Sequence, residues 1–255
     1  MRRHPLIFLA ALMLVAATAT GSANAGERIG IVLLHGGGSD GSQFNAMRPV
    51  IAKAGYGLET PNMCWSNGRR YDKSAEDCME DVDKAIAKLE AQGFHRIVVA
   101  GHSLGGINAI LYAAHHKGLA GLIVFAPSGP PQGDDRNPNV AIARQLVRSG
   151  KGDEKTTFYG GLNDFTATAR AYLSYVGKES PLYDDELLPL ISTPILWIAG
   201  TLDPGQRTAD ERFKAAPANP MNSLVSVVAD HFETPDVAVG EMIRWLDRLS
   251  ASLGD

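Results

Sequence analysis

A serine between two glycines is the segment of the sequence best suited to nucleophilic chemistry. It reads Gly101-His102-Ser103-Leu104-Gly105, and it follows an apolar run over 96–100 and precedes a helical pattern over 104–117. A strand that turns sharply into a helix strains its corner residue and needs glycines beside it, because side chains there would collide. The pattern therefore predicts a nucleophilic Ser103 above a sheet edge. The alternative is a glycine turn in which Ser103 only caps the helix.

The elements that must position this serine alternate along the chain. Short apolar runs, several rich in β-branched residues, are typical of buried parallel strands. They occur at 28–34, 57–60, 96–100, 119–126, 194–199 and 223–229. Helical patterns lie between them, at 77–89, at 104–117 and from Thr234 onward, where Thr234 is expected to cap the last helix. The alternation predicts an α/β fold, with a mostly parallel sheet of about six strands covered by helices on both faces.

Residues 128–192 depart from this alternation, because they contain no convincing strand. One helix is expected to be capped by Asn137 and to open at Pro138, and another to be capped by Asp164 and to run toward Val176. We interpret the segment as a helical lid inserted on the sheet, since functionless loops of this length are uncommon. An ordinary long crossover is the alternative.

The serine motif in its strand and helix context resembles the α/β-hydrolase superfamily, in its serine-nucleophile, esterase-like branch. The resemblance covers nearly the whole chain after residue 25 and implies the chain order nucleophile, acid, histidine. Asp203, in Gly200-Thr201-Leu202-Asp203 beyond the strand over 194–199, fits the acid. Asp210 and Asp230 are weaker rivals for this role. His231, after the last expected strand, fits the base.

The resemblance also implies two backbone donors for an oxyanion. His35-Gly36-Gly37-Gly38 directly follows the first expected strand, and glycines there let the main chain approach a substrate carbonyl. Gly37 is assigned one N–H donor, with Gly38 as the alternative, and Leu104 the other. A flexible turn is the simpler explanation of the glycines.

These parts predict acyl transfer to water through an acyl-enzyme on Ser103, with no metal and no organic cofactor. A small-molecule carboxylic ester is the expected substrate. Lactone, thioester or amide cleavage, or acyl transfer to another alcohol, would use the same residues. A non-catalytic binding protein on the same fold is the rival class, because fold does not fix function.

The first 25 residues are typical of a secretory signal, with Arg2 and Arg3, an apolar middle over 6–19 and a small-residue cleavage site at 23–25. The apolar stretch is shorter than the roughly 20 residues that span a bilayer, so no stable membrane anchor is expected. The sequence thus predicts an exported, bacterial-type protein, periplasmic or secreted, with a single domain over 26–255.

Two further features bear on compartment and partners. Cys64 and Cys78 are the two cysteines, and an exported chain can pair them as a disulfide. Two free thiols are the alternative, and a metal site is not expected because no further ligand lies at suitable spacing. The net charge is −4 and no basic run is present, so nucleic acid is not an expected partner.

Overall fold

A six-stranded, fully parallel sheet forms the centre of the protein. We describe it from a computed structural model, which covers residues 28–129, 133–159, 165–182 and 187–254. The strand order is β2-β1-β3-β4-β7-β8. The strands are β1 (Ile29–Leu34), β2 (Gly57–Glu59), β3 (Arg96–His102), β4 (Gly121–Phe125), β7 (Ile195–Gly200) and β8 (Ser223–Val227). All six lie within or close to the apolar runs of the sequence, so the predicted parallel α/β fold is confirmed.

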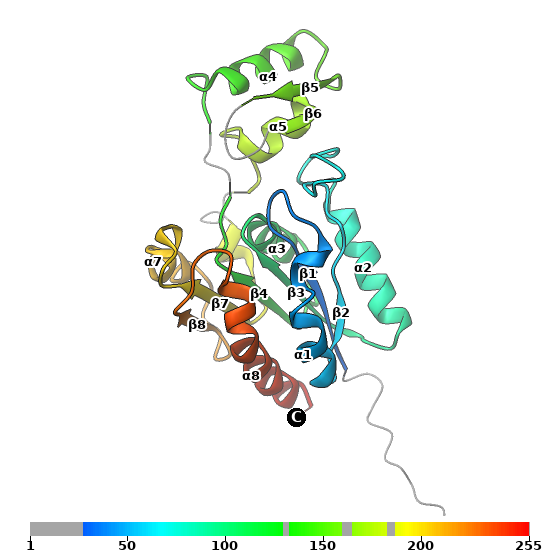
Figure 1. Ribbon diagram of the computed structural model, residues 1–255, viewed down its shortest axis with the longest axis vertical. Helices are drawn as coiled ribbons and strands as arrows, with labels where there is room; N and C mark the ends of the chain where they lie inside the picture. The colour runs from blue at the N-terminus through cyan, green and yellow to red at the C-terminus, as the bar shows by residue number, and fades with distance from the viewer. Residues whose placement is uncertain (1–27, 130–132, 160–164, 183–186, 255) are drawn as a thin grey trace, which may run out of the picture.

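Helices cover both faces of this sheet (Figure 1). On one face lie α2 (Met79–Ala91) and α3 (Leu104–His115), and on the other lie α1 (Met47–Lys53) and α8 (Thr234–Gly254). Successive strand residues point to opposite faces, so each strand feeds two hydrophobic cores. In β4, Leu122 and Val124 join the core under α2 and α3, whereas Ile123 and Phe125 join the core under α1 and α8.

The carboxyl ends of the strands bring distant parts of the chain to one edge. Leu34 is in register with Gly101 and His102 with Phe125, so β1, β3 and β4 end side by side. The segments that follow β1, β3, β7 and β8 carry Gly37, Ser103, Asp203 and His231 respectively. In open α/β sheets, ligands bind at this edge. We call it the rim.

The inserted segment forms a small layer of its own, drawn away from the sheet in Figure 1. It contains α4 (Pro138–Arg148), β5 (Lys155–Phe158), β6 (Phe165–Thr168) and α5 (Ala169–Val176). Asn137 caps α4 as expected, since its side chain accepts the amide of Asn139. The hydrophobic core of the insertion contains Val140, Phe158 and Tyr172.

Two expectations for the helices and strands were wrong. The insertion is not purely helical, because β5 and β6 pair as an antiparallel ribbon whose short, threonine-rich strands lack an apolar run. Thr234 does not cap α8, since it is the first residue of the helix and its hydroxyl donates to the carbonyl of Asp230, four residues earlier in the chain. Thr168 caps α5 by accepting the Ala171 amide; Asp164, the residue expected there, lies outside the described residues.

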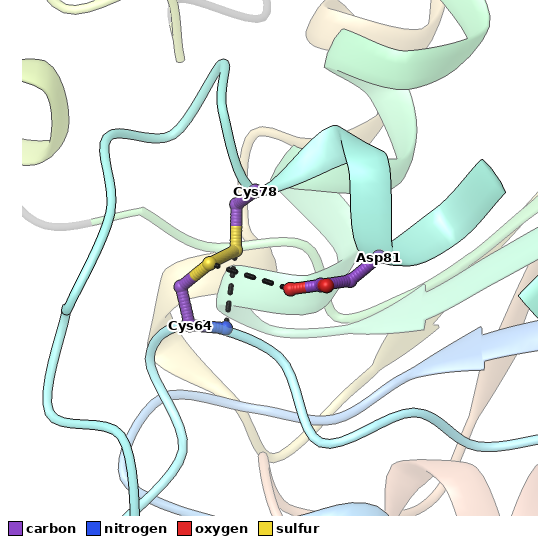
Figure 2. A group of neighbouring side chains, drawn as sticks. All are labelled: Cys64, Cys78 and Asp81. Carbon is purple, nitrogen blue, oxygen red and sulfur yellow. Dashed lines mark hydrogen bonds between the residues drawn. A yellow bond between two sulfur atoms is a disulfide. The ribbon is translucent and has the colours of Figure 1, made fainter. Parts of the chain in front are cut away.

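The two cysteines are joined, as Figure 2 shows. The disulfide between Cys64 and Cys78 closes the loop that leads from β2 into α2, with the two Cα atoms 5.8 Å apart. Within the described residues, no helix has the length and apolar character needed to cross a membrane. The expected signal segment over 1–25 lies outside them.

Candidate active site

Ser103 occupies the corner between β3 and α3 in a strained conformation. Its φ of 53° and ψ of −121° lie in a region that side-chain-bearing residues rarely adopt. A β-carbon at Gly101 would collide with the carbonyl of Gly105, and one at Gly105 would collide with the carbonyl of Leu34. These close approaches explain the two glycines of the motif. Such strain costs on the order of 1–3 kcal/mol and is concentrated at functional sites.

The three side chains singled out in the sequence meet at the rim. His231 Nε2 lies 2.9 Å from Ser103 Oγ, and His231 Nδ1 lies 2.6 Å from Asp203 Oδ2. Asp203 is buried, and its second oxygen accepts the Gly205 amide at 2.8 Å. A neutral imidazole that donates from Nδ1 to the carboxylate presents a bare Nε2 to the serine hydroxyl. This arrangement can remove the hydroxyl proton.

Neither rival carboxylate takes part in this contact. Asp230 accepts the amides of Phe232 and Glu233, each at 2.8 Å, and so shapes the turn that carries His231. Asp210 lies exposed in the first turn of α7 (Ala209–Phe213).

The glycine loop after β1 is held so that one amide faces outward. His35 is buried; its Nδ1 donates to the Gly36 carbonyl at 2.8 Å, and its Nε2 accepts the Met63 amide at 3.0 Å. Burial lowers the pKa of His35, which favours this neutral ring. Because the Gly36–Gly37 peptide is planar and trans, the Gly37 N–H points away from the anchored carbonyl. Gly37 itself is exposed.

Gly37 and Leu104 lie next to each other. A β-carbon at Gly37 would lie 3.5 Å from Leu104 Cδ2 and 3.7 Å from the Tyr71 hydroxyl. Leu104 is the first residue of α3, so its N–H has no acceptor within the helix and lies at the positive end of the helix dipole. The Gly37 N–H and the first N–H of α3, both beside the serine, suit a developing negative charge.

The rim is bordered by exposed apolar side chains. Phe232, next to His231, is 79% exposed, and Leu202, next to Asp203, is 62% exposed. On the other side, Tyr71 packs edge-on against Tyr175 of α5, with ring centroids 5.0 Å apart. The insertion therefore reaches the loop that holds Tyr71 beside Gly37.

Three side chains at the disulfide lie close enough together to be considered as metal ligands, but each is already bonded to another group. Ligand atoms of Cys64, Cys78 and Asp81 lie within 4.8 Å of one another (Figure 2). Each sulfur is bonded to the other, so neither is a thiolate. The Asp81 carboxylate accepts the Arg69 guanidinium at 2.5 Å. The group therefore anchors the loop that carries Tyr71.

The sequence as a whole matches a known protein family. The sequence profile described as "Alpha/beta hydrolase family" matches residues 31–241. The chain belongs to the alpha/beta hydrolase family. This match covers every rim segment, from the glycine loop to the turn that carries His231.

Two curated relatives share part of the chain. An AB hydrolase superfamily protein of Gibberella zeae is 34% identical over 106 residues, which are 38% of this chain and 37% of that protein. A pyrethroid hydrolase of Sphingobium wenxiniae is 32% identical over 95 residues, 36% of this chain and 34% of that protein. The matched region thus spans about a third of each relative.

Solved structures show the fold over a longer stretch. The crystal structure of a Paleococcus ferrophilus monoacylglycerol lipase superposes with a TM-score of 0.64 and 20% identity. The superposition covers 87% of this chain and 94% of the lipase. At 20% identity the similarity establishes the α/β-hydrolase fold and does not establish the reaction or the substrate.

Proposed function

We propose that this protein is a serine hydrolase that cleaves a carboxylic ester through an acyl-enzyme on Ser103. The observation that carries the proposal is the unbroken contact from Ser103 Oγ to His231 Nε2 and from His231 Nδ1 to Asp203 Oδ2. A serine hydroxyl is a weak nucleophile until an adjacent base takes its proton. The rim supplies that base and a carboxylate that orients it.

The reaction proceeds in two halves. Ser103 Oγ attacks the ester carbonyl carbon while His231 Nε2 takes the hydroxyl proton, and His231 then returns that proton to the leaving alcohol. Water attacks the acyl-enzyme with His231 again as base, which releases the acid and restores Ser103. Asp203 holds the Nδ1–H tautomer and stabilises the imidazolium that forms in each half.

The N–H groups of Gly37 and Leu104 are proposed to bind the oxyanion of both tetrahedral intermediates. Each such donor contributes about 3 to 4 kcal/mol to transition-state stabilisation in other hydrolases. The exposed position of Gly37, and the position of Leu104 in the first turn of α3, where the helix supplies no acceptor for its N–H, support this assignment. Every step uses only groups of this chain and water.

A substrate with an apolar acyl or alcohol part fits the rim best. Phe232, next to His231, and Leu202, next to Asp203, present exposed apolar surface at the rim. The relatives named pyrethroid hydrolase and monoacylglycerol lipase also support an apolar substrate. Export to the periplasm or the medium belongs to this proposal, and the disulfide supports it, because such bonds persist in oxidising compartments.

Covalent labelling of Ser103 tests the proposal. A fluorophosphonate should add one adduct to the native protein, p-nitrophenyl esters should be hydrolysed, and Ser103→Ala should lose both activities. Ser226→Ala, which alters an exposed serine on β8, is the matched control and should behave like the native protein. Normal labelling of Ser103→Ala, or a native protein inert to both reagents, would overturn the proposal.

A further inference from the structure

A chain of three hydrogen bonds runs behind the triad and joins the glycine loop to the turn of His231. The Gly36 amide donates to Gln43 Oε1 at 2.8 Å. Gln43 Nε2 lies 2.7 Å from His102 Nδ1, and His102 Nε2 lies 2.8 Å from the His231 carbonyl oxygen. We call this series the relay.

The two ends of the relay fix the direction of every bond in it. The Gly36 N–H can only donate, so Gln43 turns its oxygen toward Gly36 and its NH₂ toward His102. The His231 carbonyl can only accept, so His102 carries its proton on Nε2 and leaves Nδ1 bare to accept from Gln43. The pattern is satisfied only while His102 is neutral.

The surroundings of His102 keep it in that form. Its ring is 2% exposed, and burial lowers its pKa to about 4. The nearby His231 also lowers this pKa, while the His231 carbonyl and the Asp203 carboxylate raise it. A β-carbon at Gly36 would lie 3.1 Å from His102 Nδ1, so the glycine loop packs directly on the ring.

We propose that Gln43 and His102 are positioning residues that set the distance and orientation between the Gly37 oxyanion donor and His231. The relay holds both the peptide that precedes Gly37 and the backbone carbonyl of His231 itself. Both groups must keep their distance from Ser103 Oγ and their orientation toward it, because a misplacement of about 1 Å costs roughly 100-fold in rate. This inference rests on the proposed function.

The relay acts behind the reacting groups, which separates its effect from substrate binding. His102 is buried, and the side chain of Gln43 bonds to His102 and to the Gly36 amide. Loss of the relay should therefore lower kcat and leave KM nearly unchanged, because the groups that line the substrate path remain.

Gln43→Leu removes both side-chain bonds at almost constant volume. We expect kcat for a p-nitrophenyl ester, and the rate of fluorophosphonate labelling, to fall roughly 10- to 100-fold with KM within about twofold. Gln92→Leu is the matched control, since Gln92 also makes a side-chain hydrogen bond, to Glu59, but does so far along the sheet at the end of α2. It should leave kcat unchanged.

Gln43→Glu gives a readout that a general loss of packing would not produce. A glutamate still accepts the Gly36 amide, but it presents a second acceptor to His102 Nδ1, which must then gain a proton. We expect ¹⁵N NMR to show native His102 as the Nε2–H tautomer from about pH 5 to pH 8. In Gln43→Glu the same ring should titrate within that range, and its kcat should exceed that of Gln43→Leu.

The outcomes separate this inference from the proposed function. The His102 signals are assigned by their loss in His102→Gln. An active native protein with an unchanged kcat in Gln43→Leu, or with native His102 in the Nδ1–H tautomer, overturns the relay and leaves the hydrolase proposal standing. A native protein inert to esters and fluorophosphonate overturns the proposed function, and the relay with it.

Discussion

The rim and the insertion are held together in different ways. At the rim, buried and half-buried side chains bond across long stretches of chain: His231 meets Ser103 over 128 residues, and Gln43 meets His102 over 59. In the insertion, the ion pairs of Arg144 join Asp135 and Glu179, which are 9 and 35 residues away and largely exposed. The rim thus depends on the whole fold, whereas the insertion is a local unit.

Among the described residues, the insertion meets the rim at its start, where the Ser128 amide donates to the Ser103 carbonyl at 3.2 Å, and α5 meets the loop near the disulfide. The Ser174 hydroxyl of α5 accepts the Ala75 amide at 2.9 Å, and Tyr175 packs on Tyr71. Both α5 contacts fall in the stretch near the disulfide, not on the side chains of the triad. We therefore expect changes at the rim to alter the chemical step, and changes inside the insertion to alter local stability and access to the site.

Asp203→Asn should give the largest effect of the changes that test this difference. An amide cannot accept from His231 Nδ1 as the carboxylate does and favours the wrong tautomer, so kcat should fall roughly 10⁴-fold. The hydrolysis rate of a p-nitrophenyl ester, followed in stopped assays, would measure this loss of kcat. Asp210→Asn on α7 is the matched control and should keep native activity; an equal loss in both variants would remove Asp203 from its assigned role.

Phe158→Ala should disturb the insertion and spare the rim. Phe158 is 2% exposed and stacks on Tyr172 with centroids 4.0 Å apart, so its truncation should destabilise the insertion by roughly 4 kcal/mol. Limited proteolysis should then cut the insertion faster. Trp65 packs on Tyr175 of the insertion, so the stability of the rest of the fold is read from the fluorescence of Trp197 and Trp245 in a Trp65→Phe background.

The control for this experiment is a phenylalanine in the core under α2. Phe94→Ala should lower the urea midpoint seen by tryptophan fluorescence, whereas Phe158→Ala should shift it little. The rate of labelling by a small fluorophosphonate should stay within about threefold of native in Phe158→Ala. A labelling rate that collapsed with the insertion would show that the rim depends on it.

The same difference explains what the sequence could predict. Strand runs and the Ser103 motif are local signals, and the chain order implied by the α/β-hydrolase resemblance then pointed to Asp203 and His231, each of which directly follows an expected strand. The pairing of β5 with β6 was missed because their side chains are polar and the strands have four residues each. Gln43 was missed because its partner is remote in sequence and its own loop shows no motif.

Acid should weaken the rim before it weakens the insertion. His102 binds a proton in the unfolded chain below about pH 6.5 but in the fold only near pH 4. The unfolded state therefore holds more protons between these values, and stability falls as the pH drops through that window, by about 3 kcal/mol for this group. Buried His35, whose pKa is also lowered, adds to the loss in the same direction.

The insertion has no such group, because residues 128–192 contain no histidine. The Arg136 guanidinium holds the pKa of Asp134 at about 2, so this carboxylate stays charged at pH 4, and Arg144 lowers the pKa of Glu179 in the same direction. Urea midpoints from tryptophan fluorescence between pH 7 and pH 4 should fall steeply in the native protein and less steeply in His102→Gln. His95→Gln, an exposed histidine, should follow the native curve. Parallel curves for native and His102→Gln would show that His102 is not a buried neutral base.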